Sequence, residues 1–498
     1  MMPLALFSVD LNSGSLLLLA AILVFVAIII TKVGTRIGVP SLLLFLIVGM
    51  VAGQDGLGLK FDNYTVADTI GHFALTVILF TGGYQTSFTS IKPVLKQGIL
   101  LSTVGVVLTS VITGLFIFYA LGAYVGDVGL SFVGCCLIAA VMSSTDSAAV
   151  FSVLRGRKMN LKENIGSILE LESGSNDPMA YVLTIVLVET LKSSTDASSG
   201  VWASVGTAAS VLFIQLAVGV AVGVAVGFLA KLMLQNLYLS SHSLFYILLL
   251  SIGFLSDGFA SLLNGNGLLA VYITALIIGN TTKVSFKRGI DNFFDGITWL
   301  VQLMMFLILG LLATPSAFPQ VAIPALAAGI FMMLVARPIS VFLCLAPFRG
   351  LSLKGKAYIS WVGLKGAGPI LFALYPVLAG IDGADFVFNI VFFITLLSLL
   401  IQGITLSPVA KKLNLSYYEG PDVESFGLEV PEEMGMLRDH IVTKEDLSAG
   451  KTLRDLKLPH GIRVIMIKRS QQYLVPHGSM ELKPDDHLVL IIGETDKD

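Results

Sequence analysis

Four carboxylates interrupt apolar stretches that are otherwise long enough to cross a membrane. Glu170, Glu172 and Asp177 lie in the segment ELESGSNDPMAY, and Asp146 lies in the segment SSTDS. A charged group near the middle of a bilayer is energetically costly, so such residues pair with each other or face a cavity. These residue types therefore indicate either buried ion pairs or the binding of a mobile cation or proton.

Two basic residues lie in comparable apolar segments, Arg337 and Lys365. Glu172 and one of these bases can form a neutral pair that only holds helices together. Asp146 and Asp177 then lack a basic partner, and their excess negative charge favours a bound cation or proton. A single buried acid is as often structural as functional, but four acids and two bases favour a transport site.

The backbone beside these residues is expected to leave the helical conformation, because glycine and proline weaken helices. The expected helix-breaking residues are Gly363, Gly366, Gly368, Pro369 and Pro178. Interrupted helices at corresponding places in two halves of a chain indicate the ion site of a transporter. Each glycine taken alone also fits close packing between helices.

The composition indicates a polytopic membrane protein that is all-α within the membrane. Of the 498 residues, 55% are hydrophobic and only 13% are charged, with a mean hydropathy of +0.86, whereas soluble domains are about 25% charged. We expect 13 transmembrane helices, arranged as two inverted six-helix repeats joined by one linking helix. The crossed broken helices are expected to be the fifth and twelfth spans.

The loops and cysteines limit the orientation and the partners. Seventeen lysines and arginines fall in loops on one side of the predicted membrane, against Lys60 and Lys192 on the other. The N-terminus is therefore expected outside and the C-terminus in the cytoplasm. The three cysteines lie in apolar segments, which excludes a secreted disulfide framework. No basic run suggests a nucleic-acid partner.

Composition changes after Lys412. We expect a transmembrane domain over residues 1–412, a linker over 413–435 and a small α+β cytoplasmic module over 436–498. Its strand-like runs are IRVIMIKR, QYLVP and HLVLIIG, with one short helix over KTLRDL. The module lacks a phosphate-binding glycine loop and metal-ligand spacing, so we expect no catalysis there and no cofactor.

Five motifs resemble those of the NhaP-type cation/proton antiporters, which are relatives of the sodium/proton exchangers. They are SSTDSAAV, ELESGSNDPMA, GNGLLAVYITALIIGN, ARPISVF and GLKGAGPILFAL, in the family's order. The tail resembles an RCK-C (TrkA-C) ligand-sensing domain, as in CvrA-like potassium/proton antiporters. The resemblance implies a homodimer in the lipid of a bacterial inner membrane, with a nucleotide-type ligand on the tail.

The same resemblance implies roles for individual residues. The ion-binding residues would be Asp177, Asn176, Asp146, Thr145 and Ser173. It pairs Glu172 with Lys365, while Arg337, the second buried base, remains the alternative partner. Two residues depart from the family pattern: Lys365 replaces the usual Arg, and Thr81 stands where many relatives carry Glu.

The expected function is electroneutral exchange of K⁺, or alternatively Na⁺, for H⁺ by alternating access at Asp177, with regulation by the tail. One carboxylate holds either a proton or a cation, and the empty charged site cannot cross the low-dielectric barrier. The preference for K⁺ rests on the resemblance, and the protein would be a transporter rather than an enzyme.

Two alternatives come from other classes of protein. An RCK-gated cation channel needs a carbonyl filter of the TVGYG kind, which the sequence lacks. An intramembrane aspartyl protease would use two aspartates as a dyad and would leave Asn176 and Ser173 without a role. Glu170 has two interpretations, an acid that lines a cytoplasmic entry funnel or a solvated charge, and the sequence favours neither. Asp257 is expected to be solvated or to cap its helix, and His72 is expected to be interfacial.

Overall fold

The computed structural model describes residues 13–37, 40–122, 130–155, 159–193, 201–237, 239, 241–281, 287–418, 437–443, 446–456, 458, 462–469 and 472–492. The chain divides into two compact units, a membrane unit that ends at Tyr418 and a tail unit that contains the C-terminal strands.

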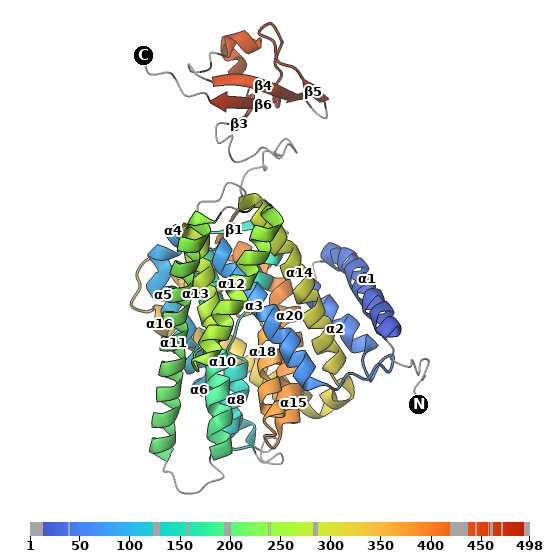
Figure 1. Ribbon diagram of the computed structural model, residues 1–498, viewed down its shortest axis with the longest axis vertical. Coiled ribbons are helices and arrows are strands. Elements are labelled where there is room, and N and C mark those ends of the chain that lie inside the picture. The colour runs from blue at the N-terminus through green and yellow to red at the C-terminus, as the bar shows by residue number, and fades with distance from the viewer. Residues whose placement is uncertain are drawn as a thin grey trace. The chain divides into compact units, whose positions relative to one another are not determined.

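The membrane unit consists almost entirely of helices, with α1 and α2 on one flank and α10 near the centre (Figure 1). Its α-helices are α1 Ser13–Ile37, α2 Ser41–Ala52, α3 Tyr64–Gln85, α4 Phe88–Ile91, α5 Leu95–Leu100, α6 Val106–Ala120, α8 Phe132–Val141, α9 Ser147–Arg155, α10 Ile165–Ser193, α11 Val201–Asn236, α12 His242–Leu262, α13 Gly267–Thr281, α14 Lys287–Leu312, α15 Phe318–Phe331, α16 Arg337–Leu345, α17 Leu353–Trp361, α18 Ala367–Phe372, α19 Leu374–Leu378 and α20 Ala384–Lys412. π-Helical turns at Leu101–Gly105 and Met332–Ala336 join α5 to α6 and α15 to α16.

Seven helical segments among the described residues are long and apolar enough to cross a membrane. They are Tyr64–Gln85, Phe88–Ala120, Ala209–Asn236, His242–Leu262, Gly289–Leu312, Pro315–Leu345 and Ala384–Lys412. Five shorter apolar helices accompany them. The prediction of a helical, polytopic membrane protein is confirmed, while the 13 spans and the inverted repeats remain predictions.

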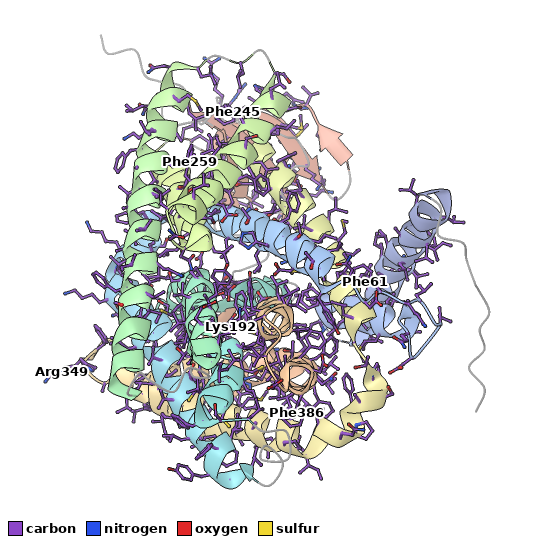
Figure 2. All side chains as sticks on the ribbon, turned by 60° about the horizontal axis from the view of Figure 1, so that its bottom comes forward. Phe61, Lys192, Phe245, Phe259, Arg349 and Phe386 are labelled. Carbon is purple, nitrogen blue, oxygen red and sulfur yellow. The ribbon has the colours of Figure 1, made fainter. Side chains whose placement is uncertain are left out.

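The outer surface of this unit is apolar. On α11 the side chains of Phe213 and Leu229 are 72% and 67% exposed, and Phe259 of α12 is 50% exposed (Figure 2). Contiguous exposed apolar surface on this scale is rare on soluble monomers. It suits contact with lipid.

Close helix packing places α13 between α11 and α3. Gly219, Gly223 and Gly227 follow one another at four-residue spacing on α11 and face α13. A Cβ at Gly223 would lie 2.7 Å from the Ala270 carbonyl oxygen, so only glycine permits this approach. This is the small-residue packing typical of membrane helices.

Two helices break at the expected places. The fifth predicted span ends as α8 at Val141 and resumes as α9 at Ser147, and the twelfth ends as α17 at Trp361 and resumes as α18 at Ala367. Hydroxyl and carboxylate side chains compete for backbone hydrogen bonds in the first break, and glycines weaken the helix in the second. Both predicted interruptions are confirmed.

Pro178 does not break its helix, and this part of the prediction is wrong. α10 continues without interruption from Ile165 to Ser193, with Pro178 inside it. Membrane helices tolerate proline where neighbouring groups satisfy the backbone. Asn266 Nδ2 donates to the carbonyl of Pro178 itself over 3.0 Å, which adds a contact between helices at this point of α10.

The predicted linker begins with a strand rather than with irregular chain. β2, Ser416–Tyr418, pairs antiparallel with β1, Met159–Leu161, which lies between α9 and α10. The Lys162 N–H also donates to the Leu415 carbonyl over 2.8 Å. The first residues after α20 therefore belong to the membrane unit, and residues 419–436 lie outside the described part of the chain.

The tail unit contains a four-stranded antiparallel sheet in the order β3-β6-β4-β5. Its strands are β3 Leu437–Ile441, β4 Ile462–Arg469, β5 Gln472–Leu474 and β6 His487–Ile492. The three predicted strands are confirmed, whereas β3 is an addition, and the predicted short helix is a single 3₁₀ turn at Leu453–Asp455. A small core that includes Val442, Ile467 and Leu488 holds the sheet together.

Candidate functional site

The two broken helices bind each other through the residues at their breaks. The Asp146 N–H donates to the Leu364 carbonyl over 2.8 Å, and Lys365 Nζ donates to the Ser144 carbonyl over 2.9 Å. Backbone groups freed in a membrane must find partners inside the protein. Each break therefore satisfies groups of the other, and together they form one polar centre.

The breaks approach each other most closely at Gly366. A Cβ at Gly366 would lie 2.2 Å from Asp146 Oδ2, and one at Gly368 would lie 3.1 Å from Ser144 Oγ. Gly363 has more room, since its nearest neighbour, Arg337 Nε, would be 3.6 Å away. Pro369 lies in the first turn of α18, where proline costs no helical hydrogen bond.

Asp177 projects from α10 towards this centre and is partly accessible. Ser144 Oγ donates a hydrogen bond to Asp177 Oδ1. No ion pair to Asp177 exists among the described side chains. Asp177 therefore meets a hydroxyl donor from the first break rather than a basic side chain.

Asn176 and Ser173 fix α10 to the first break. Asn176 Nδ2 donates to Thr145 Oγ1 over 2.5 Å, while Ser173 Oγ donates to the Thr145 carbonyl and accepts from the Ser147 N–H, each over 2.9 Å. Asn176 is buried, and its Oδ1 has no hydrogen-bond partner in the described part of the chain. That oxygen remains available to a bound ion.

Asp146 lies where the two breaks meet, and its side chain also caps the N-terminus of α9. Its Oδ1 accepts from the Ala149 N–H over 3.0 Å, in the first turn of α9. A carboxylate at a helix N-terminus is favoured by the helix dipole. The five predicted ion-site residues are thus brought together, around the point where both breaks meet α10.

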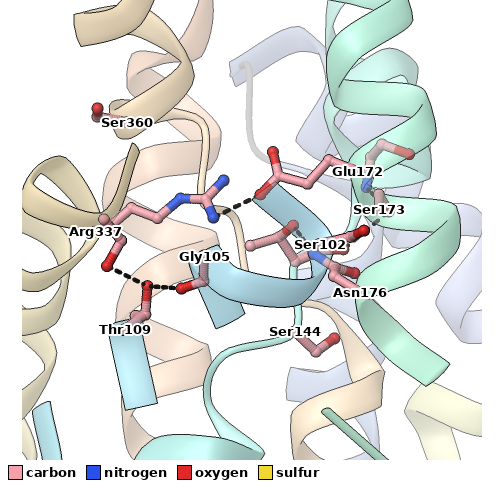
Figure 3. Close-up of polar contacts among 12 residues, drawn as sticks. Ser102, Gly105, Thr109, Ser144, Glu172, Ser173, Asn176, Arg337 and Ser360 are labelled. Carbon is pink, nitrogen blue, oxygen red and sulfur yellow. Dashed lines mark hydrogen bonds and ion pairs between the residues drawn. The ribbon is translucent and has the colours of Figure 1, made fainter. Parts of the chain in front are cut away.

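Glu172 pairs with Arg337, which corrects the expected pairing with Lys365. Arg337 Nη1 lies 2.6 Å from Glu172 Oε1, and the two residues are 4% and 0% exposed (Figure 3). Arg337 begins α16, directly after a π-helical turn, and this places its guanidinium beside α10. Lys365 is buried too, but it is engaged with the Ser144 carbonyl.

The surroundings of this ion pair are hydroxyl-rich. Thr109 Oγ1 on α6 lies 2.7 Å from the Gly105 carbonyl oxygen and 3.0 Å from the Ser340 hydroxyl, and it can donate its single hydrogen to either (Figure 3). Ser340 lies about one helical turn after Arg337 on α16. These contacts join α6, α16 and α10 beside the crossing. They suit a structural role for the Glu172–Arg337 pair.

The sequence did not predict several polar contacts of the structure. Ser144, which donates to Asp177, was visible only as one of several hydroxyls near Asp146. Asp257 is buried rather than solvated: it is 9% exposed and lies 2.8 Å from His72 Nε2. Thr81, at the position of a family glutamate, bonds to Thr298 Oγ1 over 2.9 Å.

Two family models match this chain, one for its membrane part and one for its tail. The family model described as "Sodium/hydrogen exchanger, transmembrane" matches residues 21–412, and the TrkA-C domain model matches residues 437–496. The expected resemblance of both parts is thereby confirmed.

Curated relatives match along nearly the whole chain. A protein of Shewanella baltica named "K(+)/H(+) antiporter NhaP2" is 36% identical over 496 residues, covering 97% of this chain and 82% of its own length. "K(+)/H(+) antiporter NhaP" of Alkalimonas amylolytica is 35% identical over 497 residues, covering 96% and 81%.

Among solved structures, the sodium proton antiporter MjNhaP1 from Methanocaldococcus jannaschii at pH 8 matches with a TM-score of 0.65 and 23% identity. The match covers 79% of this chain and 97% of that one. At this identity the likeness concerns the fold.

Proposed function

This chain belongs to the sodium/hydrogen exchanger family, whose members are transporters rather than enzymes, and from that membership we propose exchange of one monovalent cation for one proton at Asp177. K⁺ is the preferred cation, because the relatives that match nearly the whole chain are named K⁺/H⁺ antiporters.

The surroundings of Asp177 are the main support for this proposal. It accepts a hydrogen bond from Ser144 at the crossing of the two breaks, while Arg337 is engaged with Glu172 and Lys365 with a backbone carbonyl. A carboxylate in a low-dielectric setting is costly unless something neutralises it. A proton or a cation supplies that neutralisation, and either one excludes the other.

The oxygens around Asp177 suit a hard monovalent cation. Asn176 contributes a free amide oxygen, and Asp146 contributes a second carboxylate. Ser173 has its hydroxyl occupied on both sides, so we assign it to holding the break in place. Because only one charge is exchanged for another, the cycle is electroneutral.

Alternating access would expose the ion site at Asp177 to one side of the membrane and then to the other. Seven long apolar segments, five shorter apolar helices and the acid-bearing α10 together supply thirteen helices for the proposed 13 spans. The loop charges support an external N-terminus and a cytoplasmic C-terminus. We extend the proposal to a homodimer in a bacterial inner membrane.

The tail is proposed to regulate exchange. Residues 1–412 would transport, residues 413–435 would connect, and the TrkA-C-like module at 436–498 would bind a nucleotide-type cytoplasmic ligand. A ligand shifts transport only through its different affinity for two states of the protein. The charges on the module, which keep it soluble, do not identify that ligand.

Everted membrane vesicles test the proposal. Adding K⁺ should release accumulated protons from vesicles with the wild-type chain and not from those with Asp177→Asn, and the apparent cation affinity should weaken at low pH. Asp382→Asn, in an exposed turn, is the matched control. Exchange by Asp177→Asn, a cation affinity independent of pH, or an ionic current in place of exchange would each refute it.

A further inference from the structure

Glu170 and Asp177 lie on the same face of α10. They are seven residues apart, which is two helical turns or about 10 Å along the axis. Gly174 lies between them on that face, four residues after Glu170. The loop charges assign the Glu170 end of the helix to the cytoplasm.

The end of α3 meets α10 at Glu170. Thr86 Oγ1 lies 2.7 Å from both Glu170 Oε1 and the Gly82 carbonyl oxygen, and its single hydrogen can be donated to either. Thr86 is 1% exposed and Glu170 is half-buried. Thr86 therefore gives this half-buried acid a partner inside the protein, which favours an acid that lines the cytoplasmic funnel over a solvated charge.

Tyr272 of α13 fills the space beside Gly174. A Cβ at Gly174 would lie 2.5 Å from Tyr272 Cε2 and 3.1 Å from its Oη, and a Cβ at Gly83 would lie 3.2 Å from Tyr272 Cδ2. The ring is thus seated between a glycine of α3 and a glycine of α10. It occupies the face of α10 that separates Glu170 from Asp177.

In the described part of the chain the Tyr272 hydroxyl has no hydrogen bond of good geometry, although the residue is only 4% exposed. Thr86 is within reach as a weak partner, and Glu170 lies nearby. Buried tyrosine hydroxyls usually have a partner, and burying one without a partner is unfavourable. Phenylalanine would fill the same space without this cost. The hydroxyl therefore points to a partner that binds during the cycle.

We propose that Glu170, Thr86 and Tyr272 form a second subsite for a monovalent cation, two turns of α10 on the cytoplasmic side of Asp177. One carboxylate and two hydroxyl oxygens match the charge and the hard-oxygen preference of K⁺ or Na⁺. This cytoplasmic subsite rests on the proposed function, because it loads the cation that Asp177 exchanges.

Tyr272→Phe is the direct test, because it removes only the hydroxyl and keeps the ring between the two glycines. With rubidium as the K⁺ analogue at the cytoplasmic face, the KM should rise about tenfold, as expected for one lost contact to a charged species, with little change in kcat. Tyr358→Phe is the matched control, because it also removes a buried hydroxyl, bonded to the Leu406 carbonyl over 3.3 Å. An unchanged KM in Tyr272→Phe overturns the subsite.

Thr86→Val provides a second variant should Tyr272→Phe fold poorly, and it should raise the rubidium KM in the same way. Equilibrium binding of rubidium to the purified full chain at alkaline pH separates the two sites. Asp177→Asn should keep a residual site that the added Glu170→Gln change removes. Binding by Asp177→Asn that Glu170→Gln leaves unaltered contradicts the subsite.

The subsite and the proposed function fail differently. Exchange that survives Asp177→Asn removes the proposed function. Loss of exchange in Asp177→Asn together with an unchanged KM in both Tyr272→Phe and Thr86→Val removes only the subsite. Glu189→Gln, an exposed acid on the same helix, controls for charge loss on α10.

Discussion

Arg337 Nη1 lies 2.6 Å from Glu172 Oε1, with both residues buried. Burying two opposite charges is costly, and other polar atoms of this pair, Glu172 Oε2 and Arg337 Nε and Nη2, have no hydrogen-bond partner among the described residues. The pair neutralises the charge of Glu172, whereas Asp177, five residues later, has no ion pair among the described side chains.

Breaking this ion pair should destabilise the protein more than changing the transport site does. Glu172→Gln leaves Arg337 buried and uncompensated, which costs roughly 3–5 kcal/mol of unfolding free energy. Arg337→Ala should do the same, and Asp177→Asn should cost less. Melting temperatures of the purified variants give the order, and a larger loss for Lys365→Ala than for Arg337→Ala would contradict the assigned pairing.

Gly366→Ala should abolish exchange. The new Cβ would lie 2.2 Å from Asp146 Oδ2, so the two breaks must separate or distort, at a cost of roughly 1–3 kcal/mol. Vesicle exchange and thermal melting measure both effects. Gly296→Ala on α14 is the control, because a Cβ there meets nothing within 4 Å. Normal exchange by Gly366→Ala would show that the crossing does not need this close approach.

Ser144→Ala should weaken cation binding at Asp177. It removes the hydroxyl that donates to Oδ1, and a hydrogen bond to a charged group is worth about 1.5–3 kcal/mol, so the KM for K⁺ should rise at least about tenfold. Ser143→Ala tests the neighbouring buried hydroxyl, which donates to the Ala140 carbonyl over 2.6 Å. Equal KM values for the two variants would remove Ser144 from the site.

The tail should lose stability in acid through Asp486. Burial alone would raise the pKa of Asp486, but hydrogen bonds from Arg469 and the Lys483 N–H hold it below its ordinary value. A carboxyl with a lowered pKa in the folded state stabilises above about pH 4 and loses that contribution as the pH falls through its folded pKa. Asp486→Asn should therefore destabilise the tail at pH 7 by about 2 kcal/mol and much less at pH 3.

Limited proteolysis of the tail in the full chain, followed at both pH values, measures this effect. Asp485→Asn is the matched control, since Asp485 is exposed and has a positive φ of 67°, which asparagine accepts. Equal protease resistance of Asp486→Asn and the wild type at pH 7 would show that the Arg469 contact adds no stability.

Two truncations should separate transport from regulation. A chain ending at Tyr418 keeps β2 and should exchange cations normally while losing any response to cytoplasmic nucleotides or pH. A chain ending at Lys412 also loses the pairing with β1 and should be less stable. Vesicle assays across pH and candidate nucleotides give the comparison. Identical curves for the full chain and the Tyr418 truncation would make the tail a passive appendage.

The breaks and the polar centre could be predicted because their residue types are costly in a membrane helix. Asp146, Asp177 and the glycines around Lys365 all contradict a simple apolar span, so their positions in the sequence stand out. Pro178 also predicts a break, yet α10 continues through it, because membrane helices tolerate a proline where tertiary packing supports the backbone.

Partner choice could not be predicted because it depends on distances between helices. Arg337 and Lys365 are equivalent as charges in a sequence, and only the placement of α16 beside α10 selects Arg337. Asp257 was misjudged for the same reason, since His72 lies 185 positions away on α3. The position of the Tyr272 hydroxyl likewise depends on the packing of α13 against Gly174 of α10, which the sequence does not reveal.

The short ladder between β1 and β2 gives the C-terminal end of the membrane unit a mechanical attachment. Ser416 is in register with Leu161, and only three residues separate Leu161 from the start of α10. A displacement of the chain after Tyr418 would therefore reach the start of α10, the helix that carries Asp177, as well as α20. Movement of the chain after Tyr418 and the binding of an ion would then act on the same helix, the first at its start and the second near its middle.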